Sequence, residues 1–497
     1  MSHPVRALYD NLDRKVDRPA LYEGETVLTH GELITRVERA AGDLARRGIG
    51  PGARVALCAA NTADHVIAYL AILRAGAVWT PLNPRNGARL NTALAARARP
   101  DLVLVDAASA SQLGEASALD LSDWLRNLPD TPPPPPIHDE PDAPFALKFT
   151  GGSTGVPKGV VQSQASGRAA LDSLSAFYGF GPDDVNLAVA PLTHGSSHYV
   201  LPVLAAGGAH VLLARPDRPH ILDELKRRAS VVFMPPTLIT LLMAEADFGP
   251  TDFHALRHLT WSAAPMAPAR VAEAIARFGP VISTLYGQTE APMAITGLSA
   301  TAMTDPALAD SVGRALPGTP VRLLTADGRL LSQGEGEVVV GGDLARTHYL
   351  DDPEQTAAAR HEGWLRTGDL GRIGEDGVLR LIGRTKDLII TGGYNVYPAE
   401  VEAALVAHPA VAEACAFAIP DPVWGERLEA AVAVAADAAP GLAADLTAFV
   451  REAVGPVRTP KRLHLLPALP RNPVGKVVRD EVRALCHPQT VLEEVPS

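Results

Sequence analysis

The chain has 497 residues, of which 47% are hydrophobic and 20% charged, and its formal net charge is -11. The length predicts at least two domains, and the balance of apolar and charged residues excludes a disordered chain. The acidic total excludes a general nucleic-acid binder, which needs a cationic surface, but it leaves room for an anionic ligand in a locally basic pocket.

The predicted elements alternate between helices and short buried strands. Thr29 and Glu32 form a capping box that begins a helix, Gly48 ends it, and a second helix follows at residues 65–74. Short apolar runs predict strands at residues 55–59, 102–105, 145–149, 186–190, 210–213, 231–234 and 281–285. This alternation predicts an α/β fold, with a large multilayer N-terminal domain built on mixed, largely parallel sheets.

The pattern changes after residue 311. Two turn signals, Asp327-Gly328 and Asp376-Gly377, lie between apolar runs and predict antiparallel hairpins. Residues 398–408 and 442–454 then predict helices, and residues 414–419 and 429–435 predict strands. We therefore expect two domains, residues 1–384 and a small α+β C-terminal domain at residues 385–497.

The cysteines and the N-terminus exclude other classes. Cys58, Cys415 and Cys486 form no CxxC pair, so neither a zinc knuckle nor a disulfide framework is indicated. Residues 1–19 lack the apolar core of a signal peptide, and the longest apolar run, residues 231–243, is interrupted by two prolines. We expect a cytoplasmic protein with no membrane span and no nucleic-acid partner.

A glycine-rich loop follows the predicted strand at residues 145–149. It reads TGGSTGVPKG over residues 150–159. Glycines let successive backbone N–H groups face an anion, and the hydroxyl side chains and Lys158 add further donors, so the loop suits a triphosphate. It does not match the Walker A pattern, because Gly159 follows Lys158. A flexible surface loop is the alternative.

This loop resembles the phosphate loop of adenylate-forming enzymes, which include acyl- and aryl-CoA synthetases. Four further segments resemble the motifs of that superfamily in the same order: YGQTE at 286–290, TGD at 367–369, GRTKD at 383–387 with GGYNVYPAEVE at 392–402, and NPVGK at 472–476. The resemblance covers nearly the whole chain. Five motifs in order distinguish it from a chance match.

The resemblance implies an ATP-dependent acid–CoA ligase. In the first step a carboxylate attacks the α-phosphate of ATP to form an acyl-adenylate and pyrophosphate, and in the second the thiol of CoA replaces AMP. Two anions meet in the first step, so positioning and charge neutralisation dominate catalysis. The resemblance gives Lys476 the role of the cation between the two anions. It also implies that Glu290 and Thr154 are the Mg²⁺ ligands, and one carboxylate with one hydroxyl suffices because phosphate oxygens bind the ion as well.

The resemblance also implies nucleotide and CoA contacts. Tyr286 would stack on adenine, Asp369 and Arg384 would bind the ribose, and Lys386 would be the hinge about which the C-terminal domain rotates between the two steps. After rotation Gly392, Gly393 and Trp424 would line the pantetheine path, although a packed core tryptophan is the alternative for Trp424. The full set that it assigns to nucleotide and CoA binding is Thr150, Gly151, Gly152, Ser153, Thr154, Gly155, Lys158, Tyr286, Gly287, Thr289, Asp369, Arg384, Gly392, Gly393 and Trp424.

The acyl pocket is expected along residues 191–198. His194 matches the residue that gates this pocket in the superfamily, and His198 either offers a polar contact to the acid or is a structural histidine. The polar character of the segment favours a small aromatic or short acyl acid. His348 stands before Tyr349 where the superfamily has glycine, and we expect no catalytic consequence.

Several alternatives stay open at this point. The acyl group could pass to a carrier-protein thiol or to an amine instead of CoA, and a non-catalytic nucleotide-binding scaffold is a third class, against which the joint presence of Lys476, Glu290 and Asp369 speaks. Basic residues between 451 and 479 are expected to offset the net negative charge near ATP and CoA. A homodimer is also open, since dimers occur in such families.

Overall fold

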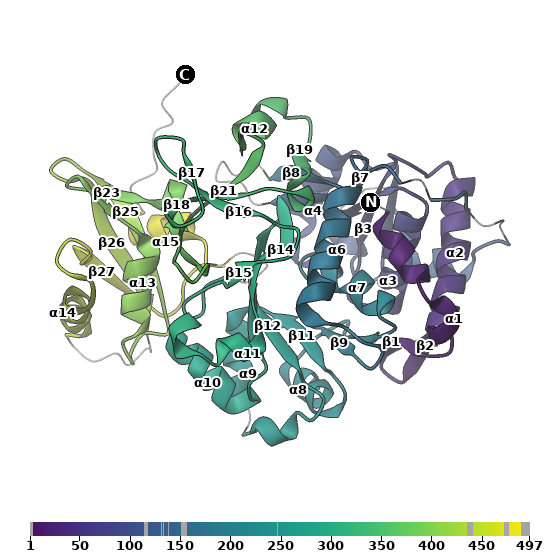
Figure 1. The fold of residues 1–497 in the computed structure, drawn as a ribbon, viewed down its shortest axis with the longest axis horizontal. Coiled ribbons are helices and arrows are strands. Elements are labelled where there is room, and N and C mark those ends of the chain that lie inside the picture. Colours follow the sequence, from purple (N-terminus) through teal and green to yellow (C-terminus); the bar gives the residue numbers. More distant parts are fainter. Residues whose placement is uncertain are drawn as a thin grey trace.

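The computed structural model describes residues 3–113, 118–130, 132, 134–137, 139–150, 157–245, 247–434, 441–471 and 477–488. Within these residues the strands form four sheets. Three sheets lie in a large N-terminal part and the fourth lies in a smaller C-terminal part, which occupies the left side of Figure 1 in yellow-green. The predicted α/β architecture with a smaller second domain is confirmed.

Two sheets with mostly parallel pairing form the centre of the N-terminal part. The strands in the middle of each of these sheets pair in parallel, and the antiparallel pairs lie toward the sheet edges. The first sheet has the strand order β15 (Arg314–Ala315), β14 (Ala291–Leu298), β13 (Ile282–Gln288), β12 (His258–Trp261), β11 (Val231–Met234), β9 (Val185–Ala188), β10 (Ala209–Leu212), β1 (Pro19–Glu23) and β2 (Thr26–Thr29). The second has the order β19 (Thr347–Tyr349), β8 (Lys158–Ser163), β7 (Pro144–Thr150), β4 (Val78–Pro81), β3 (Arg54–Cys58), β5 (Leu102–Val105) and β6 (Leu119–Asp120).

The remaining two sheets are mainly antiparallel. The third consists of β17 (Leu330–Leu331), β16 (Val321–Leu324), β18 (Gly334–Val340), β21 (Trp364–Ile373) and β20 (Arg360–His361), with β22 (Leu379–Arg384) paired to β21. The fourth consists of β24 (Tyr394–Val396), β23 (Ile389–Thr391), β26 (Gly425–Ala433) and β25 (Glu413–Asp421), with β27 (Arg462–Leu466) paired in parallel to β26. Both predicted hairpins are confirmed, because β16 pairs with β17 and β21 pairs with β22.

Helices cover the faces of these sheets. Those of the N-terminal part are α1 (Leu12–Lys15), α2 (His30–Arg46), α3 (Ala63–Arg74), α4 (Ala88–Ala98), α5 (Leu121–Arg126), α6 (Gln164–Tyr178), α7 (Ser197–Ala205), α8 (Arg218–Arg227), α9 (Pro236–Glu245), α10 (Pro268–Phe278), α11 (Ala300–Met303) and α12 (Pro353–Ala358). The C-terminal part has α13 (Pro398–Val406), α14 (Leu442–Val454) and α15 (Arg479–Cys486). Among the described helices, none is long and apolar enough to cross a membrane.

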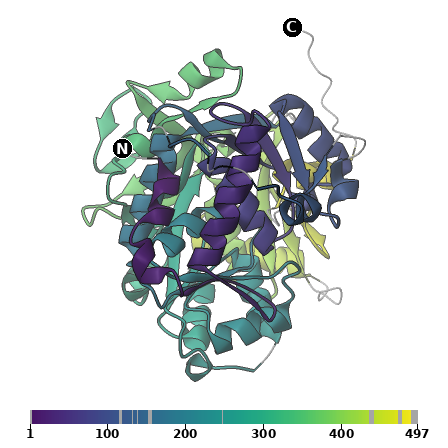
Figure 2. The same cartoon turned by 90° about the vertical axis from the view of Figure 1, so that its right-hand side faces the viewer.

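The apolar cores explain why the chain forms two parts. The largest cluster joins α2 and α3 to the second sheet and to α7, with Leu33, Leu70, Trp79 and Leu204 all buried. The side view in Figure 2 brings α2, the long purple helix, to the front of this layer. A separate cluster within residues 389–450 packs α13 and α14 on the fourth sheet. Since β22 ends at Arg384 and β23 begins at Ile389, the predicted boundary at 384 lies between two sheets, and it stays a prediction.

Most predicted elements are confirmed, and two strands that extend beyond their predicted bounds do so for a common reason. The Thr29 side chain accepts a hydrogen bond from the Glu32 backbone N–H and begins α2 as expected, while α14, β5 and β11 have the predicted bounds. However, β13 continues through Tyr286 to Gln288, and β26 begins at Gly425. An antiparallel partner extends each of these strands, β14 in the first case and β25 in the second.

Candidate functional site

Three predicted nucleotide-binding residues lie in contact with one another. Tyr286 is on β13, whereas Asp369 and Arg384 face each other across the β21–β22 pair. The Tyr286 hydroxyl donates to Asp369 Oδ2 at 2.6 Å, and Arg384 Nε lies 3.0 Å from Asp369 Oδ1. The first and third sheets therefore meet at the Asp369 carboxylate.

The electrostatics of this group suit a ligand with hydroxyl groups. Burial, and then the adjacent Asp369 carboxylate, raise the pKa of Tyr286 well above its usual range, so Tyr286 stays a neutral donor. Asp369 is only 6% exposed; its Oδ2 accepts a hydrogen bond from Tyr286 and its Oδ1 forms an ion pair with Arg384. A carboxylate has two acceptor oxygens and can accept a hydrogen bond from each hydroxyl of a diol, which is the chemistry that a ribose presents.

A second group surrounds Glu290, at the end of the β13–β14 turn. Tyr349 on β19 donates its hydroxyl to Glu290 Oε1 at 2.9 Å, and Lys158 Nζ lies 5.7 Å from the centre of the Tyr349 ring. Lys158 and Thr150 face each other in the β7–β8 pair, so these two residues begin and end the glycine-rich loop. The structure thus brings the ends of this loop close to Glu290.

Glu290 has the chemistry of a magnesium ligand. Tyr349 occupies one of its oxygens, and within the described residues Oε2 accepts no hydrogen bond. The Glu290 backbone is fixed as well, because its carbonyl accepts from Thr347 and the neighbouring Thr289 carbonyl accepts from Gln162, each at 2.7 Å. Mg²⁺ prefers one or two carboxylates with phosphate oxygens, so this partly exposed carboxylate fits the ion.

Gly287 makes the turn between these two groups possible. A Cβ atom at this position would lie 2.5 Å from the backbone N of Met293 and 2.6 Å from its Cα. These contacts are far below van der Waals distance and involve backbone that cannot move away easily. Glycine is therefore required for β13 and β14 to approach each other between Tyr286 and Glu290.

The predicted acyl segment contains two neutral histidines. Asn83 Nδ2 lies 3.0 Å from His194 Nε2, and burial, with Lys148 and Arg85 nearby, lowers the pKa of His194 to about 4. His198 Nε2 lies 3.0 Å from Lys148 Nζ, and burial lowers its pKa well below the usual range. Both imidazoles can accept a hydrogen bond at neutral pH, and neither carries a charge.

The predicted CoA residues form a surface group on the C-terminal part. Gly392 and Gly393 have φ values of +57° and +82°, and a Cβ on Gly392 would lie 2.8 Å from the Trp424 ring. Trp424 is 46% exposed, and Lys461 Nζ lies 5.3 Å from its ring centre. Trp424 is thus not a packed core residue, and the alternative raised from sequence is wrong.

The predicted hinge residue, Lys386, is exposed in the short 3-10 turn Thr385–Asp387. Arg479 at the start of α15 binds the next residue, Asp387, at 2.6 Å, and it also binds Glu402 at 2.7 Å. Arg458 pairs with Glu400 and Arg471 pairs with Glu413. Carboxylates distant in sequence thus pair with three of the basic residues that were expected, between residues 451 and 479, to offset the net negative charge near ATP and CoA.

Part of the predicted site lies outside the described residues. These are Gly151, Gly152, Ser153, Thr154 and Gly155 of the loop, and Lys476. The roles given to them stay predictions.

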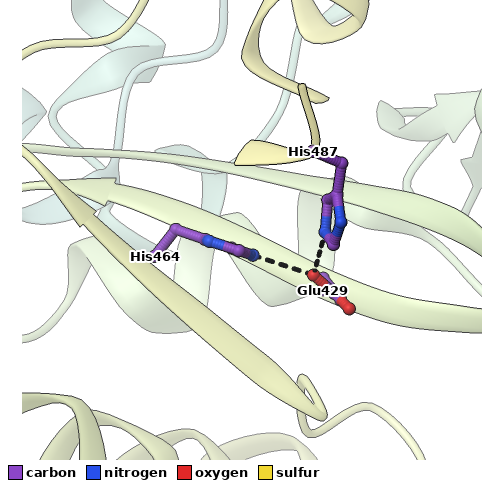
Figure 3. Close-up of side chains that lie close together, drawn as sticks. All are labelled: Glu429, His464 and His487. Atoms are coloured by element: carbon purple, nitrogen blue, oxygen red, sulfur yellow. Dashed lines mark hydrogen bonds and ion pairs between the residues drawn. The ribbon is translucent and has the colours of Figure 1, made fainter. Parts of the chain in front are cut away.

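A further cluster of ionisable residues lies on the fourth sheet (Figure 3). Glu429 Oε2 is 2.8 Å from His464 Nε2 and 2.7 Å from His487 Nε2, and Arg427 binds the other oxygen at 2.7 Å. The ligand atoms of Glu429 and the two histidines lie within 4.8 Å of one another, close enough for a metal ion. Three donors already satisfy the Glu429 carboxylate. We therefore interpret the cluster as a structural one that connects β26 to β27 through His464 and to the end of α15 through His487.

Two residues of the site were missed by sequence reasoning. The sequence analysis gives no role to Tyr349, yet its hydroxyl donates a hydrogen bond to Glu290. Asn83, which fixes His194, lies 111 positions away in the chain. The resemblance at residues 348–349 could have pointed to Tyr349, but no local pattern identifies Asn83, because only the fold brings it to His194.

Comparison with known proteins identifies two matching families. Residues 8–350 match the AMP-binding enzyme family and residues 400–476 match the AMP-binding enzyme C-terminal domain. The chain is 31% identical to the medium/long-chain-fatty-acid–CoA ligase FadD8 of Mycobacterium tuberculosis, over 97% of this chain and 90% of that protein. It is 34% identical to a feruloyl-CoA synthase of Amycolatopsis, over 93% of this chain and 95% of that protein.

The fold also matches a solved structure closely. The amide bond synthetase McbA from Marinactinospora thermotolerans superposes with a TM-score of 0.87 at 30% identity, covering 97% of this chain and 99% of that one. The match extends over both parts of the chain.

The Glu429 cluster makes a testable prediction for stability. Glu429→Gln removes a buried charge from two imidazoles and a guanidinium, so we expect the free energy of unfolding to fall by about 2 kcal/mol. Urea unfolding measures this change. Glu452→Gln, at an exposed position on α14, is the control and should change stability by less than about 0.5 kcal/mol.

The same cluster predicts a pH dependence. Burial raises the pKa of Glu429, but hydrogen bonds from His464, His487 and Arg427 outweigh burial and lower it below its ordinary value. The contribution of Glu429 is therefore complete above the unfolded-state pKa of about 4.3 and is lost as the pH falls below it. The difference in unfolding free energy between wild type and Glu429→Gln should therefore shrink as the pH is lowered from about 5. A difference that grows as the pH is lowered would contradict this assignment.

Proposed function

Since the chain belongs to the AMP-binding enzymes, in the acyl- and aryl-CoA synthetase branch of the adenylate-forming superfamily, we propose that it activates a small aromatic or short acyl acid with ATP and transfers the acyl group to CoA. It is an acid–thiol ligase that releases AMP and pyrophosphate. The observation that supports its nucleotide site best is the contact of Tyr286 and Arg384 with one buried carboxylate, Asp369.

The described residues account for much of the first step. Asp369 and Arg384 would hold the ribose, Tyr286 would cover the adenine, and Lys158 with the loop after Thr150 would contact the phosphates. Glu290, oriented by Tyr349, would hold Mg²⁺ together with Thr154. When bound, this ion neutralises phosphate charge, which favours attack by a second anion.

The acid would lie beside His194. Because its imidazole is neutral and hydrogen-bonded to Asn83, His194 offers a fixed, uncharged wall at the entrance of the pocket. Lys476 would then approach the reacting oxygens and neutralise the charge that develops on them. For the second step we propose rotation of residues 385–497 about Lys386, which would bring Gly392, Gly393 and Trp424 to the entering thiol.

The acceptor has a second candidate. The similarity to an amide bond synthetase favours an amine acceptor as the alternative, and a carrier-protein thiol is a further one. A screen of aromatic, short-chain and long-chain acids for ATP–pyrophosphate exchange tests the adenylation step, and mass spectrometry after addition of CoA tests the acceptor. Exchange without a CoA thioester would defeat the CoA assignment. Cytoplasmic location and a homodimer stay predictions.

The catalytic lysine makes the sharpest prediction. Lys476→Ala should reduce ATP–pyrophosphate exchange by about 10²–10³-fold, because the transition state loses a positioned cation. Circular dichroism should show an unchanged fold. Lys226→Ala, at an exposed lysine of α8, is the matched control and should retain full exchange. Undiminished adenylation by Lys476→Ala would refute this role.

The second step can be separated from the first at Trp424. Trp424→Ala should raise the KM for CoA about tenfold through loss of aromatic contact area, and it should leave ATP–pyrophosphate exchange unchanged. Val423→Ala is a close control, since Val423 is 79% exposed on the same turn. An equal effect of both variants on CoA, or a loss of exchange in Trp424→Ala, would contradict a specific role in CoA binding.

A further inference from the structure

The proposed ribose ligand, Asp369, lies in an irregular part of its strand. Between the pairs that Glu337 and Val339 of β18 form with β21, β18 has one residue and β21 has three, residues 367–369. This difference defines a β-bulge in β21, a feature that often occurs beside functional sites and sets the direction of a side chain there. Asp369 is the last residue of the bulge.

Side chains bind the backbone of this bulge on both sides of Gly368. Glu337 Oε1 accepts a hydrogen bond from the Gly368 N–H at 3.0 Å, and Thr367 Oγ1 accepts one from the Asp369 N–H at 3.1 Å. The Thr367 hydroxyl donates in turn to the carbonyl oxygen of Val338 at 2.7 Å. The two peptide units that flank Gly368 are therefore both held, and with them the backbone conformation that leads into Asp369.

The second oxygen of Glu337 binds the residue just before the bulge. Arg366 donates to Glu337 Oε2 from Nε at 2.9 Å and from Nη2 at 2.7 Å. Glu337 is only 7% exposed, so its charge would be costly without such donors. One carboxylate thus connects the start of the bulge to its central residue, Gly368, with one oxygen for each.

Packing leaves the bulge free to move, so these hydrogen bonds matter for its shape. Gly368 has a φ of +73°, and no described atom would lie within 4 Å of a Cβ placed on it. The Asp369 carboxylate nevertheless has to meet Tyr286 at 2.6 Å and Arg384 at 3.0 Å. Contacts of this length weaken with small displacements, so the backbone before Asp369 has to be held accurately.

We propose that Glu337 is a positioning residue for the nucleotide: through the Gly368 N–H it holds the bulge in the conformation that directs the Asp369 carboxylate at the two ribose hydroxyls. This inference rests on the proposed function and adds a residue that need not touch the ligand. The reach of the side chain is decisive, because the Gly368 N–H lies at a fixed place, whereas the partly exposed Arg366 side chain can follow a displaced carboxylate.

The test measures how strongly the protein distinguishes ATP from 2′,3′-dideoxyATP, which lacks both ribose hydroxyls. Titration calorimetry with the full chain and Mg²⁺ gives the affinity for each nucleotide and requires no acid. The wild type should bind ATP at least about 30-fold more tightly, since both hydroxyls would donate to a charged acceptor. Equal affinities would overturn the inference alone, whereas binding of neither nucleotide would overturn the proposed function as well.

Two variants separate the reach of Glu337 from its charge. Glu337→Asp keeps the charge but is one methylene too short for the Gly368 N–H, so the preference for ATP should fall about tenfold. Glu337→Gln keeps the length and a carbonyl acceptor, so its preference should stay within about threefold of the wild type. A wild-type preference in Glu337→Asp, or an equal loss in Glu337→Gln, would overturn the inference and leave the ligase function standing.

The same strand offers a matched control. Glu335 also lies on β18 and accepts from Arg372 of β21 at 2.7 Å, but this pair is exposed and belongs to the regular part of the ladder. Glu335→Gln should therefore keep the wild-type preference for ATP. A loss in Glu335→Gln as large as that in Glu337→Asp would show a general effect of Glu–Arg pairs on this sheet and would overturn the specific role of Glu337.

A kinetic measurement and a second variant complete the test. With an acid that supports ATP–pyrophosphate exchange, Glu337→Asp should raise the KM for ATP about tenfold and change kcat less than about threefold, because the ribose is held in both ground and transition states. A fall in kcat at unchanged KM would point to loss of folded enzyme and would overturn the inference. If Glu337→Asp does not fold, Thr367→Val removes the other acceptor of the bulge, and an unchanged preference for ATP in that variant would overturn the inference.

Discussion

The Asp369 carboxylate is the point at which separate parts of the N-terminal fold are held together. It is nearly buried, and it accepts a hydrogen bond from Tyr286 of the first sheet and forms an ion pair with Arg384 of the third. Without these donors a buried anion would be costly, so the two sheets have to approach each other here. Glu290 follows Tyr286 by four residues and Lys386 follows Arg384 by two, so the proposed metal ligand and hinge both take their positions from this contact.

A ligand that binds at the Asp369 carboxylate would take the place of partners that this carboxylate already has. A ribose would replace or share the contacts that Tyr286 and Arg384 already make with Asp369, so the site needs little reorganisation to accept it. The turn at Gly287 and the Tyr349 hydroxyl keep Glu290 near the ends of the glycine-rich loop. The short stretch from Tyr286 to Glu290 thus contacts the proposed diol acceptor, Asp369, at one end and carries the proposed metal ligand at the other, and the backbone of Met293 leaves room only for glycine at position 287.

Pairing and burial determine the electrostatic surroundings of each basic residue more than the net charge of the chain does. Arg458 and Arg479 belong to a basic stretch of sequence, yet carboxylates on α13 and in the segment before β23 neutralise them. Lys148 lies in an apolar stretch of sequence, and within the described residues it has no carboxylate partner. Its partners are instead the Ser197 hydroxyl and the His198 imidazole, so neither the net charge nor the neighbouring sequence shows how a basic residue is accommodated.

The sequence by itself determined the family, the order of most elements and the residue types of the nucleotide site. Capping at Thr29, the hairpin turn at Asp376-Gly377 and the YGQTE and TGD motifs are local patterns, and local patterns depend on neighbours along the chain. Only the tertiary structure decided which residues meet. Tyr286 reaches Asp369 across 83 positions and Asn83 reaches His194 across 111, and Trp424 is exposed because β25 and β26 turn there at the surface. Such contacts follow from sheet pairing and core packing between distant segments, which no single stretch of sequence encodes.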